Sequence, residues 1–164
     1  MESARLRYLP ITADQLEDFH RLVVDDHIRR YLMDGNLFDR QWAAARIADS
    51  EQLFRSSGVG LWLARERSSD QLVGFCGFLV FSELQPEPQL LYALLEPFTG
   101  RGLATEMGQA CIAEARRHPG FTTIYSGVDE VNAASLRVLE KLGFQRVSVV
   151  PGSFGNLHML RLDG

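Results

Sequence analysis

The chain lacks the features that define several broad classes of protein. Its two cysteines lie inside apolar stretches and lack the spacing of a metal site, which favours two reduced core thiols over a disulfide or a nucleophilic cysteine. No apolar run reaches the length of about 20 residues that a membrane-spanning helix needs, and the first residues contain no apolar core of a signal peptide. We therefore expect a cytoplasmic protein that keeps Cys76 and Cys111 reduced in its core, with no metal and no membrane partner.

An excess of positive charge is also absent. The 17 lysines and arginines are outnumbered by 21 aspartates and glutamates, which gives a net charge of -4. Nucleic acid is therefore not expected as a main partner. An anionic ligand would have to be bound by local groups, such as the free backbone amides at the start of a helix.

What is present is the composition of one ordinary globular domain over residues 1–164, with 46% hydrophobic and 23% charged residues. Apolar periodicity and helix-capping residues predict an α/β (α+β) fold, in which helices cover both faces of a mixed sheet. Strands are expected at residues 5–9, 61–65, 72–82, 89–95, 123–128, 145–150 and 157–162, and helices at residues 12–23, 39–57, 102–118 and 132–142.

The most informative segment is residues 94–106, which read LLEPFTGRGLATE. Here a strand ends, Gly100 and Gly102 allow the backbone to turn, and a helix begins at once. The first amides of that helix have no helical partner and lie at the positive end of its dipole, which suits a pyrophosphate. Taken alone, two such glycines after a strand are more often a plain tight turn, and the pattern is neither a P-loop nor a dinucleotide-binding fingerprint.

A second segment, residues 131–144, follows the strand at residues 123–128. Asn132 is a good N-cap residue, and Gly143 suits the left-handed position that ends a helix. Phe144 would then fold back onto the last turn, as in a Schellman motif. Capping alone is a sufficient reason for Asn132 and Ser135.

Together the two segments resemble the motifs of a known family. Residues 99–104 resemble the Gln/Arg-x-x-Gly-x-Gly/Ala pyrophosphate motif of the GNAT acetyltransferases, and residues 132–144 resemble the second cofactor-side motif of that superfamily. Tyr92 and residues 97–106 look most like the subgroup that acetylates the N-termini of ribosomal proteins. The resemblance implies a single-domain GNAT fold with a mostly antiparallel sheet of six to seven strands and about four helices. That sheet would be splayed between the strands at residues 89–95 and 123–128.

The resemblance also implies acetyl-CoA as co-substrate and a role for each motif residue. The pantetheine arm would pair with Leu94 and Leu95 and receive a hydrogen bond from Asn132. Ser135 would lie near the sulfur and protonate the leaving thiolate, a role that many relatives give to tyrosine. The pyrophosphate would be held by the segment Gly100, Arg101, Gly102, Leu103, Ala104 and Thr105.

Three positions depart from the family pattern and leave the acceptor open. Thr99 stands where Gln or Arg is usual, Gln89 stands where subgroup relatives often have glutamate, and residues 150–152 replace a common Glu-Gly pair. We favour a protein or peptide α-amine as acceptor. The alternatives are a small amine (an antibiotic, a polyamine or an amino acid), an acyl-CoA-binding module without activity, and a site for another anion. The protein would be a monomer or a homodimer.

An α-amine demands less of a general base than a lysine does. An α-amino group has a pKa of about 7.7–8.0, whereas neutralising a lysine at pH 7 costs about 4–5 kcal/mol. Asp129 and Glu130 are the favoured catalytic carboxylates, because they directly follow a strand and precede Asn132. The other candidates are Glu83, Glu87, Glu96 and His158 for proton transfer, and Phe38 and Trp42 for shaping the acceptor pocket.

Overall fold

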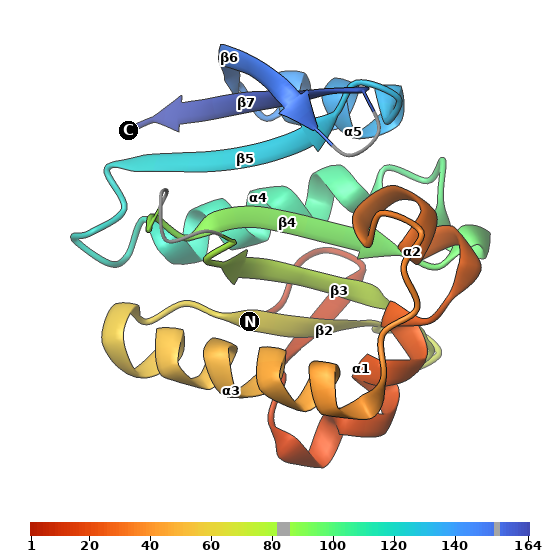
Figure 1. The fold of residues 1–164 in the computed structure, drawn as a ribbon. Helices are drawn as coiled ribbons and strands as arrows, with labels where there is room; N and C mark the ends of the chain where they lie inside the picture. Colours follow the sequence, from red (N-terminus) through yellow and green to blue (C-terminus); the bar gives the residue numbers. More distant parts are fainter. Residues whose placement is uncertain (82–85, 153–154) are drawn as a thin grey trace.

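The computed structural model describes residues 1–81, 86–152 and 155–164. One seven-stranded sheet with the strand order β1-β2-β3-β4-β5-β7-β6 runs through the described part (Figure 1). Adjacent strands are antiparallel except β4 and β5, which are parallel. The strands are β1 (Leu6–Pro10), β2 (Leu61–Glu66), β3 (Leu72–Leu79), β4 (Gln89–Leu94), β5 (Thr123–Asp129), β6 (Gln145–Gly152) and β7 (Gly155–Asp163).

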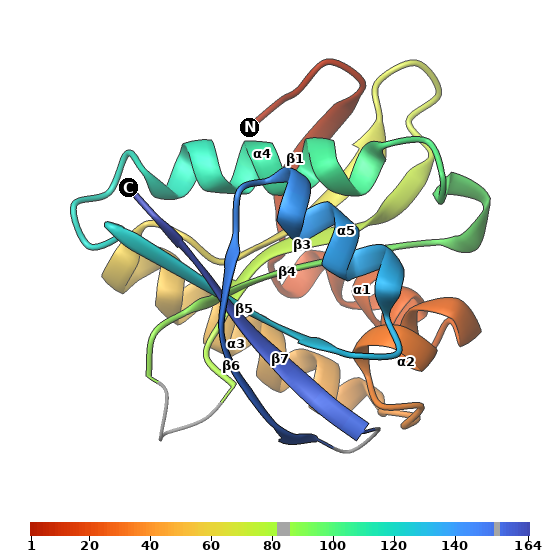
Figure 2. The same cartoon turned by 90° about the horizontal axis from the view of Figure 1, so that it is seen from above.

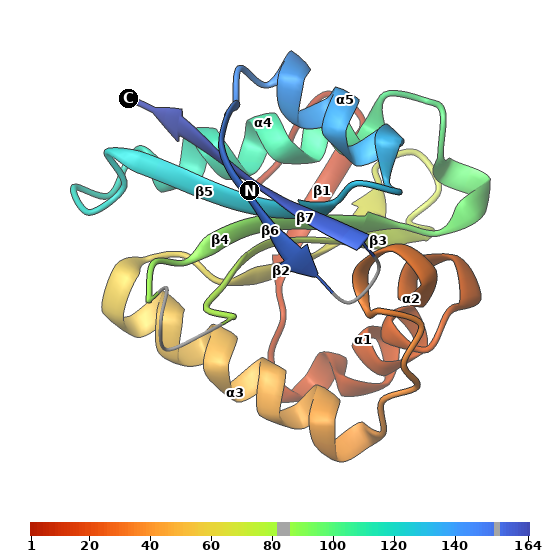
Figure 3. The same cartoon turned by 45° about the horizontal axis from the view of Figure 1, so that its top comes forward.

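Helices cover both faces of this sheet, as the sequence predicted (Figures 2 and 3). Two apolar clusters fill the spaces between sheet and helices, and alternate residues of β3 enter opposite clusters, with Cys76 and Phe78 in one and Phe75 and Leu79 in the other. The helices are α1 (Leu16–Val23), α2 (Asp26–Leu32) and α3 (Arg40–Ser57) on one face, and α4 (Leu103–Ala115) and α5 (Ala133–Lys141) on the other, with short 3-10 turns η1 (Ala13–Gln15) and η2 (Glu96–Phe98).

Most of the expected elements are found, with a few differences. Helix α2 was not expected; Asp25 caps it by accepting hydrogen bonds from the amides of His27 and Ile28. The strand expected at residues 72–82 ends at Leu79, and Ser82 lies outside the described residues.

The end of α5 and the two cysteines agree with the sequence predictions. Gly143 has a φ of 89°, and the amides of Phe144 and Gly143 donate to the carbonyls of Leu139 and Glu140 at 3.0 Å each, which is a Schellman motif. Cys76 and Cys111 are free and buried. In the described ranges, no helix is both long and apolar enough to cross a membrane, and no group of three or more His, Cys, Asp or Glu residues could hold a metal.

The sheet opens between β4 and β5. Their parallel pairing is limited to Gln89 and Tyr125. Directly after this pair, the hydroxyl of Ser126 donates to the carbonyl of Leu90 at 2.9 Å, so a side chain takes the place of the backbone bond. The two strands separate beyond that point (Figure 1). The backbone of β4 is thus not paired with β5 at the end where both motifs lie.

Candidate active site

The start of α4 forms a cradle of free amides. Gly100 and Gly102 have φ angles of 70° and 76°, in the left-handed region that favours glycine. The first helical hydrogen bond runs from the amide of Glu106 to the carbonyl of Gly102. The amides of Leu103, Ala104 and Thr105 therefore have no helical acceptor, and the helix dipole adds positive potential there. Because Leu103 is buried in the core, the position of this helix start is fixed.

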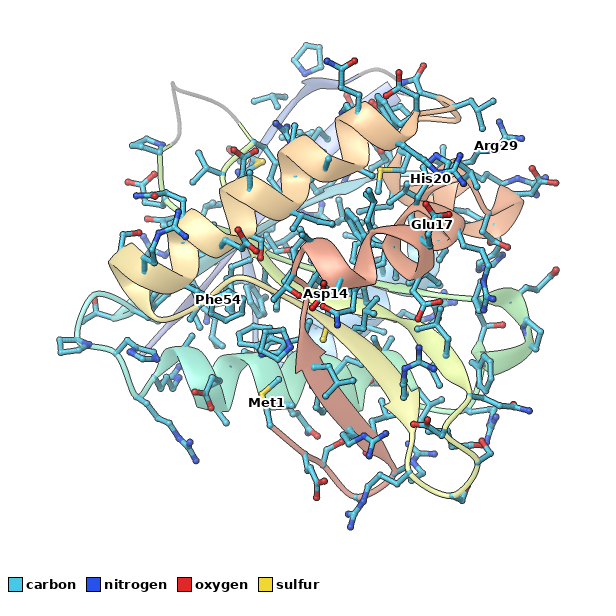
Figure 4. The ribbon with its side chains drawn as sticks, turned by 90° about the horizontal axis from the view of Figure 1, so that it is seen from below. Met1, Asp14, Glu17, His20, Arg29 and Phe54 are labelled. Atoms are coloured by element: carbon cyan, nitrogen blue, oxygen red, sulfur yellow. The ribbon has the colours of Figure 1, made fainter. Side chains whose placement is uncertain are left out.

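The N-terminal segment, residues 1–5, contacts the start of α4 and the turn before it, which was not predicted from the sequence. Glu106 accepts hydrogen bonds from the Ser3 hydroxyl, the Arg5 amide and the Arg5 guanidinium, each at 2.7 Å. Arg5 also donates to the carbonyl of Arg101 at 2.8 Å. Met1 packs against the core beneath α4 (Figure 4). These contacts tie the turn before α4 to the edge of the sheet.

Replacing Glu106 by glutamine is expected to lower the free energy of unfolding by about 1–2 kcal/mol at pH 7. Partial burial alone would raise the pKa of Glu106, but the hydrogen bonds from Ser3 and Arg5 and the charge of Arg5 outweigh it and hold that pKa below its usual value. The ion pair therefore contributes fully above the ordinary glutamate pKa of about 4.3 and is lost as the pH falls through the lower folded-state pKa.

Urea denaturation of both proteins at pH 7 and at pH 3 measures this effect. The difference between wild type and variant should shrink at the lower pH. Glu114→Gln is the control on the same helix. Among the described residues Glu114 forms an ion pair with Arg117 alone, one turn away, and its replacement should change stability by less than about 0.5 kcal/mol. Equal stabilities of wild type and Glu106→Gln at pH 7 would contradict the role given to this carboxylate.

Arg101 is turned away from the cradle. Its guanidinium donates to the carboxylate of Glu66 at 3.0 Å and lies 5.6 Å from the ring centre of Phe98. Thr99 donates its hydroxyl to the carbonyl of Glu96, one turn back. A phosphate bound at this helix start would therefore meet mainly backbone amides, while these two side chains stabilise the turn.

The unpaired edge of β4 has the backbone of Leu94, rather than that of Leu95, available for hydrogen bonding. The amide of Leu95 donates to Val73 on β3 at 2.9 Å, and its carbonyl accepts from Phe98 at 3.0 Å. Because neighbouring residues of a strand point their backbone groups in opposite directions, the amide and carbonyl of Leu94 point toward β5. A pantetheine arm lying in the opening between the strands would therefore pair with Leu94.

At the start of α5, Ser135 lies beside a tyrosine of β4. The Ser135 amide donates to the side-chain oxygen of Asn132 at 3.1 Å, which leaves the Asn132 amide group free to donate. The hydroxyls of Tyr92 and Ser135 are 3.0 Å apart, and Tyr92 also reaches the carbonyl of Ser135 at 3.2 Å. Burial raises the pKa of Tyr92 to about 12, against a lowering by its hydrogen bond to Ser135. Tyr92 is therefore neutral at physiological pH, and its one proton can be donated to the carbonyl or to the hydroxyl of Ser135.

A pocket of about 630 Å³ lies where α2 meets the loop between β5 and α5. Its walls bring together residues that are about a hundred positions apart in the sequence. It is lined by Asp26, Arg29, Arg30, Tyr31, Gly35, Asp129, Val131 and Asn132. This volume suits a small molecule or the end of a peptide. Since Asn132 belongs both to this pocket and to the second motif, the pocket adjoins the expected pantetheine site.

The adjacent carboxylates of Asp129 and Glu130 lie in different surroundings. Asp129 lines the pocket, where burial and, to a lesser extent, the charge of Asp34 raise its pKa. Glu130 is outside the pocket lining. Its carboxylate accepts a hydrogen bond from Asn156 at 3.0 Å and lies 3.9 Å from the Nε2 atom of His158. Of the two, only Asp129 lines the pocket.

The remaining sequence candidates lie elsewhere. Glu87 and Glu96 are exposed, and Glu83 lies outside the described residues. The rings of Phe38 and Trp42 stack on each other with centres 4.1 Å apart, and Trp42 packs against the core under α3. Neither aromatic ring lines the pocket.

Comparison with known proteins assigns the family. The model of the family described as "Acetyltransferase (GNAT) domain" matches residues 5–145, and the chain belongs to this family. It is an acetyl-CoA-dependent N-acetyltransferase with acetyl-CoA as its co-substrate. Two Bacillus subtilis (strain 168) proteins are similar in sequence. YkkB, described as uncharacterized, is 27% identical over 131 residues (79% of this chain, 75% of its own), and the uncharacterized N-acetyltransferase YoaA is 24% identical over 150 residues (92% and 85%).

Solved structures show the same fold at low sequence identity. A GNAT-family acetyltransferase from Bordetella pertussis, itself described as putative, has a TM-score of 0.85 at 21% identity over 98% of this chain and 97% of its own. RimL, a ribosomal-protein α-N-acetyltransferase in complex with coenzyme A, has a TM-score of 0.81 at 15% identity (98% and 95%). Spermidine N-acetyltransferase from Vibrio cholerae, in complex with CoA and spermine, has a TM-score of 0.78 at 11% identity (98% and 96%). The acceptors of these proteins differ, so the fold does not identify the acceptor of this chain.

Proposed function

We propose that the enzyme transfers the acetyl group directly from acetyl-CoA to an α-amine, such as the N-terminus of a protein or peptide, with Asp129 as the group that takes the proton. The observation that carries this proposal is the position of Asp129. Its carboxylate lies in the pocket beside Asn132, and no cation among the described residues forms an ion pair with it. A carboxylate is a weak base, and an α-amine requires no stronger one.

The other residues of the site would position the co-substrate. The amides of Leu103, Ala104 and Thr105 would bind the pyrophosphate, and the Asn132 amide group and the Leu94 backbone would orient the pantetheine arm. Acetyl-CoA supplies the reactive thioester. Ser135, oriented by Tyr92, would donate a proton to the departing thiolate. Alignment of the amine with the thioester accounts for most of the remaining rate enhancement.

A thiol-release assay with acetyl-CoA and a panel of amines tests the acceptor class. The panel contains peptides with a free α-amine, the same peptides with that amine blocked and one lysine present, and spermidine. Only the free α-amine peptides should be acetylated efficiently. Turnover of spermidine alone would favour the small-amine alternative, and CoA binding without turnover of any amine would favour a binding module.

Replacing Asp129 by asparagine is expected to lower kcat/KM for an α-amine peptide about 10- to 100-fold. The pH–rate profile should also change. In the wild type, the rate rises as the pH passes through the raised pKa of Asp129 and then through that of the amine, whereas the variant should show only the second rise.

Glu130→Gln is the matched control for this variant. Glu130 is the adjacent carboxylate, more than half exposed and outside the pocket, so its replacement should change kcat/KM less than about threefold. An unchanged pH–rate profile in Asp129→Asn would remove Asp129 as the base. A larger loss in Glu130→Gln than in Asp129→Asn would assign that role to Glu130.

The same proposal includes a cytoplasmic location and a monomeric or homodimeric state. Acetyl-CoA is the co-substrate, and two free buried cysteines are typical of a reducing compartment. Sedimentation analysis of the purified protein would distinguish the two oligomeric states.

A further inference from the structure

The pocket is lined by charged residues of both signs, and two of these residues form an ion pair with each other. Asp26 and Arg29 form an ion pair within α2, with the Nη2 atom of Arg29 2.5 Å from the carboxylate of Asp26. Arg29 projects from α2 at the edge of the molecule (Figure 4) and also donates to the carbonyl of Gly35 at 3.4 Å. This pair therefore adds little net charge to the pocket, and the remaining charged lining residues are Asp129 and Arg30.

Asp129 makes the wall nearest the cofactor motif acidic. It lies at the end of β5, three residues before Asn132, and the charge of Asp34 is close enough to raise the pKa of Asp129. An ammonium group placed there would be attracted by two carboxylates. The amine of an acceptor is therefore expected at this wall, next to the opening between β4 and β5.

Arg30 makes the opposite wall basic. It is an exposed residue of α2 that lines the pocket, and no carboxylate among the described residues forms an ion pair with it. A guanidinium is permanently charged and offers a planar pair of donors that matches a carboxylate. A second ammonium group of an acceptor would be repelled at this wall.

We propose that the pocket selects an acceptor that carries a carboxylate close to its amine, with the amine at Asp129 and the carboxylate at Arg30. An N-terminal peptide segment with an acidic second residue can place its amine at Asp129 and its side-chain carboxylate at Arg30 at the same time. Polycationic acceptors, such as polyamines, do not. This inference rests on the proposed function and extends it from α-amines in general to acidic ones.

The test uses three peptides that differ only at the second residue. Alanyl-glutamyl, alanyl-glutaminyl and alanyl-lysyl peptides, each amidated at the C-terminus, are compared in the thiol-release assay at 50 mM and 500 mM salt. The glutamyl peptide should have about fivefold higher kcat/KM than the glutaminyl peptide, and the lysyl peptide should be the poorest. The difference should lie mainly in KM and should shrink at the higher salt.

Reversing the charge of Arg30 should reverse the order of the peptides. In Arg30→Glu, the lysyl peptide is expected to become the best acceptor, while the affinity for CoA is unchanged. Arg55→Glu is the control, because Arg55 is exposed on α3 and outside the pocket lining. It should leave the wild-type order intact.

Three results would overturn the inference, and they can be distinguished. Equal kcat/KM for the three peptides, or an unchanged order in Arg30→Glu, would reject the acidic preference while leaving α-amine acetylation in place. Turnover of spermidine but of none of the three peptides would reject the proposed function, and this inference with it.

Discussion

Replacing Gly102 by valine is expected to weaken binding of coenzyme A by at least about a hundredfold. Gly102 has a φ of 76°, and a side chain there costs about 1–2 kcal/mol for an ordinary residue and more for a β-branched one. Relief of that strain would rotate the amides of Leu103, Ala104 and Thr105 away from the position of the pyrophosphate. Each amide that no longer reaches the pyrophosphate loses a charge-assisted hydrogen bond of about 1.5–3 kcal/mol.

The fold itself should tolerate this change. A Cβ atom at Gly102 would have as its nearest neighbour the Nη2 atom of Arg5 at 3.7 Å, which is an ordinary contact. Calorimetric titration with CoA measures the affinity, and a thermal melt checks that the protein is folded. Gly155→Val is the matched control, since Gly155 has a φ of 96° with no described atom within 4 Å and lies outside both the cradle and the pocket lining. Near-normal CoA affinity in Gly102→Val would reject the cradle.

Replacing Ser135 by alanine should have the second-largest effect, lowering kcat about a hundredfold with little change in CoA affinity. The thiolate would then leave without a proton donor, while the Asn132 cap and the α5 backbone are retained. Tyr92→Phe should have a smaller effect, because it leaves the serine hydroxyl in place and removes the tyrosine hydroxyl that contacts it at 3.0 Å and the Ser135 carbonyl at 3.2 Å.

Single-turnover measurements at saturating acetyl-CoA separate this chemical step from product release. Ser148→Ala, at an exposed serine of β6, is the control and should be as active as the wild type. If Ser135→Ala retains more than half of the wild-type kcat, Ser135 is not the proton donor. A larger loss in Tyr92→Phe than in Ser135→Ala would give that role to the tyrosine.

The parts of the fold that could be predicted from sequence are those with local signals. Gly102 and Asn132 are the N-caps of α4 and α5 and predict where these helices begin. Gly143 predicts where α5 ends. The helix α2 has seven residues, too few for a clear apolar period, and it was missed. Strands with apolar residues on both faces were recognised as continuous apolar runs, but their order in the sheet could not be deduced from the runs themselves.

The candidate site was only partly predictable, because its contacts join distant parts of the chain. Glu106 is bound by residues a hundred positions earlier, and Tyr92 meets Ser135 across the opened sheet. Asp129 ends β5 and Glu130 begins the turn that follows, so their order in the sequence could not say which of the two carboxylates enters the pocket. The opposite wall of the pocket comes from α2, the helix that the sequence did not reveal.

The central claim is that one cleft joins the cradle at α4, the hydroxyl of Ser135 and the carboxylate of Asp129. A crystal structure of the protein with bound CoA tests it most directly. The pyrophosphate should accept hydrogen bonds from the amides of Leu103, Ala104 and Thr105. The CoA sulfur should lie within hydrogen-bond reach of Ser135 and open into the pocket that Asp129 lines. A pyrophosphate bound away from the start of α4, or a sulfur that points away from Ser135 and this pocket, would contradict the account.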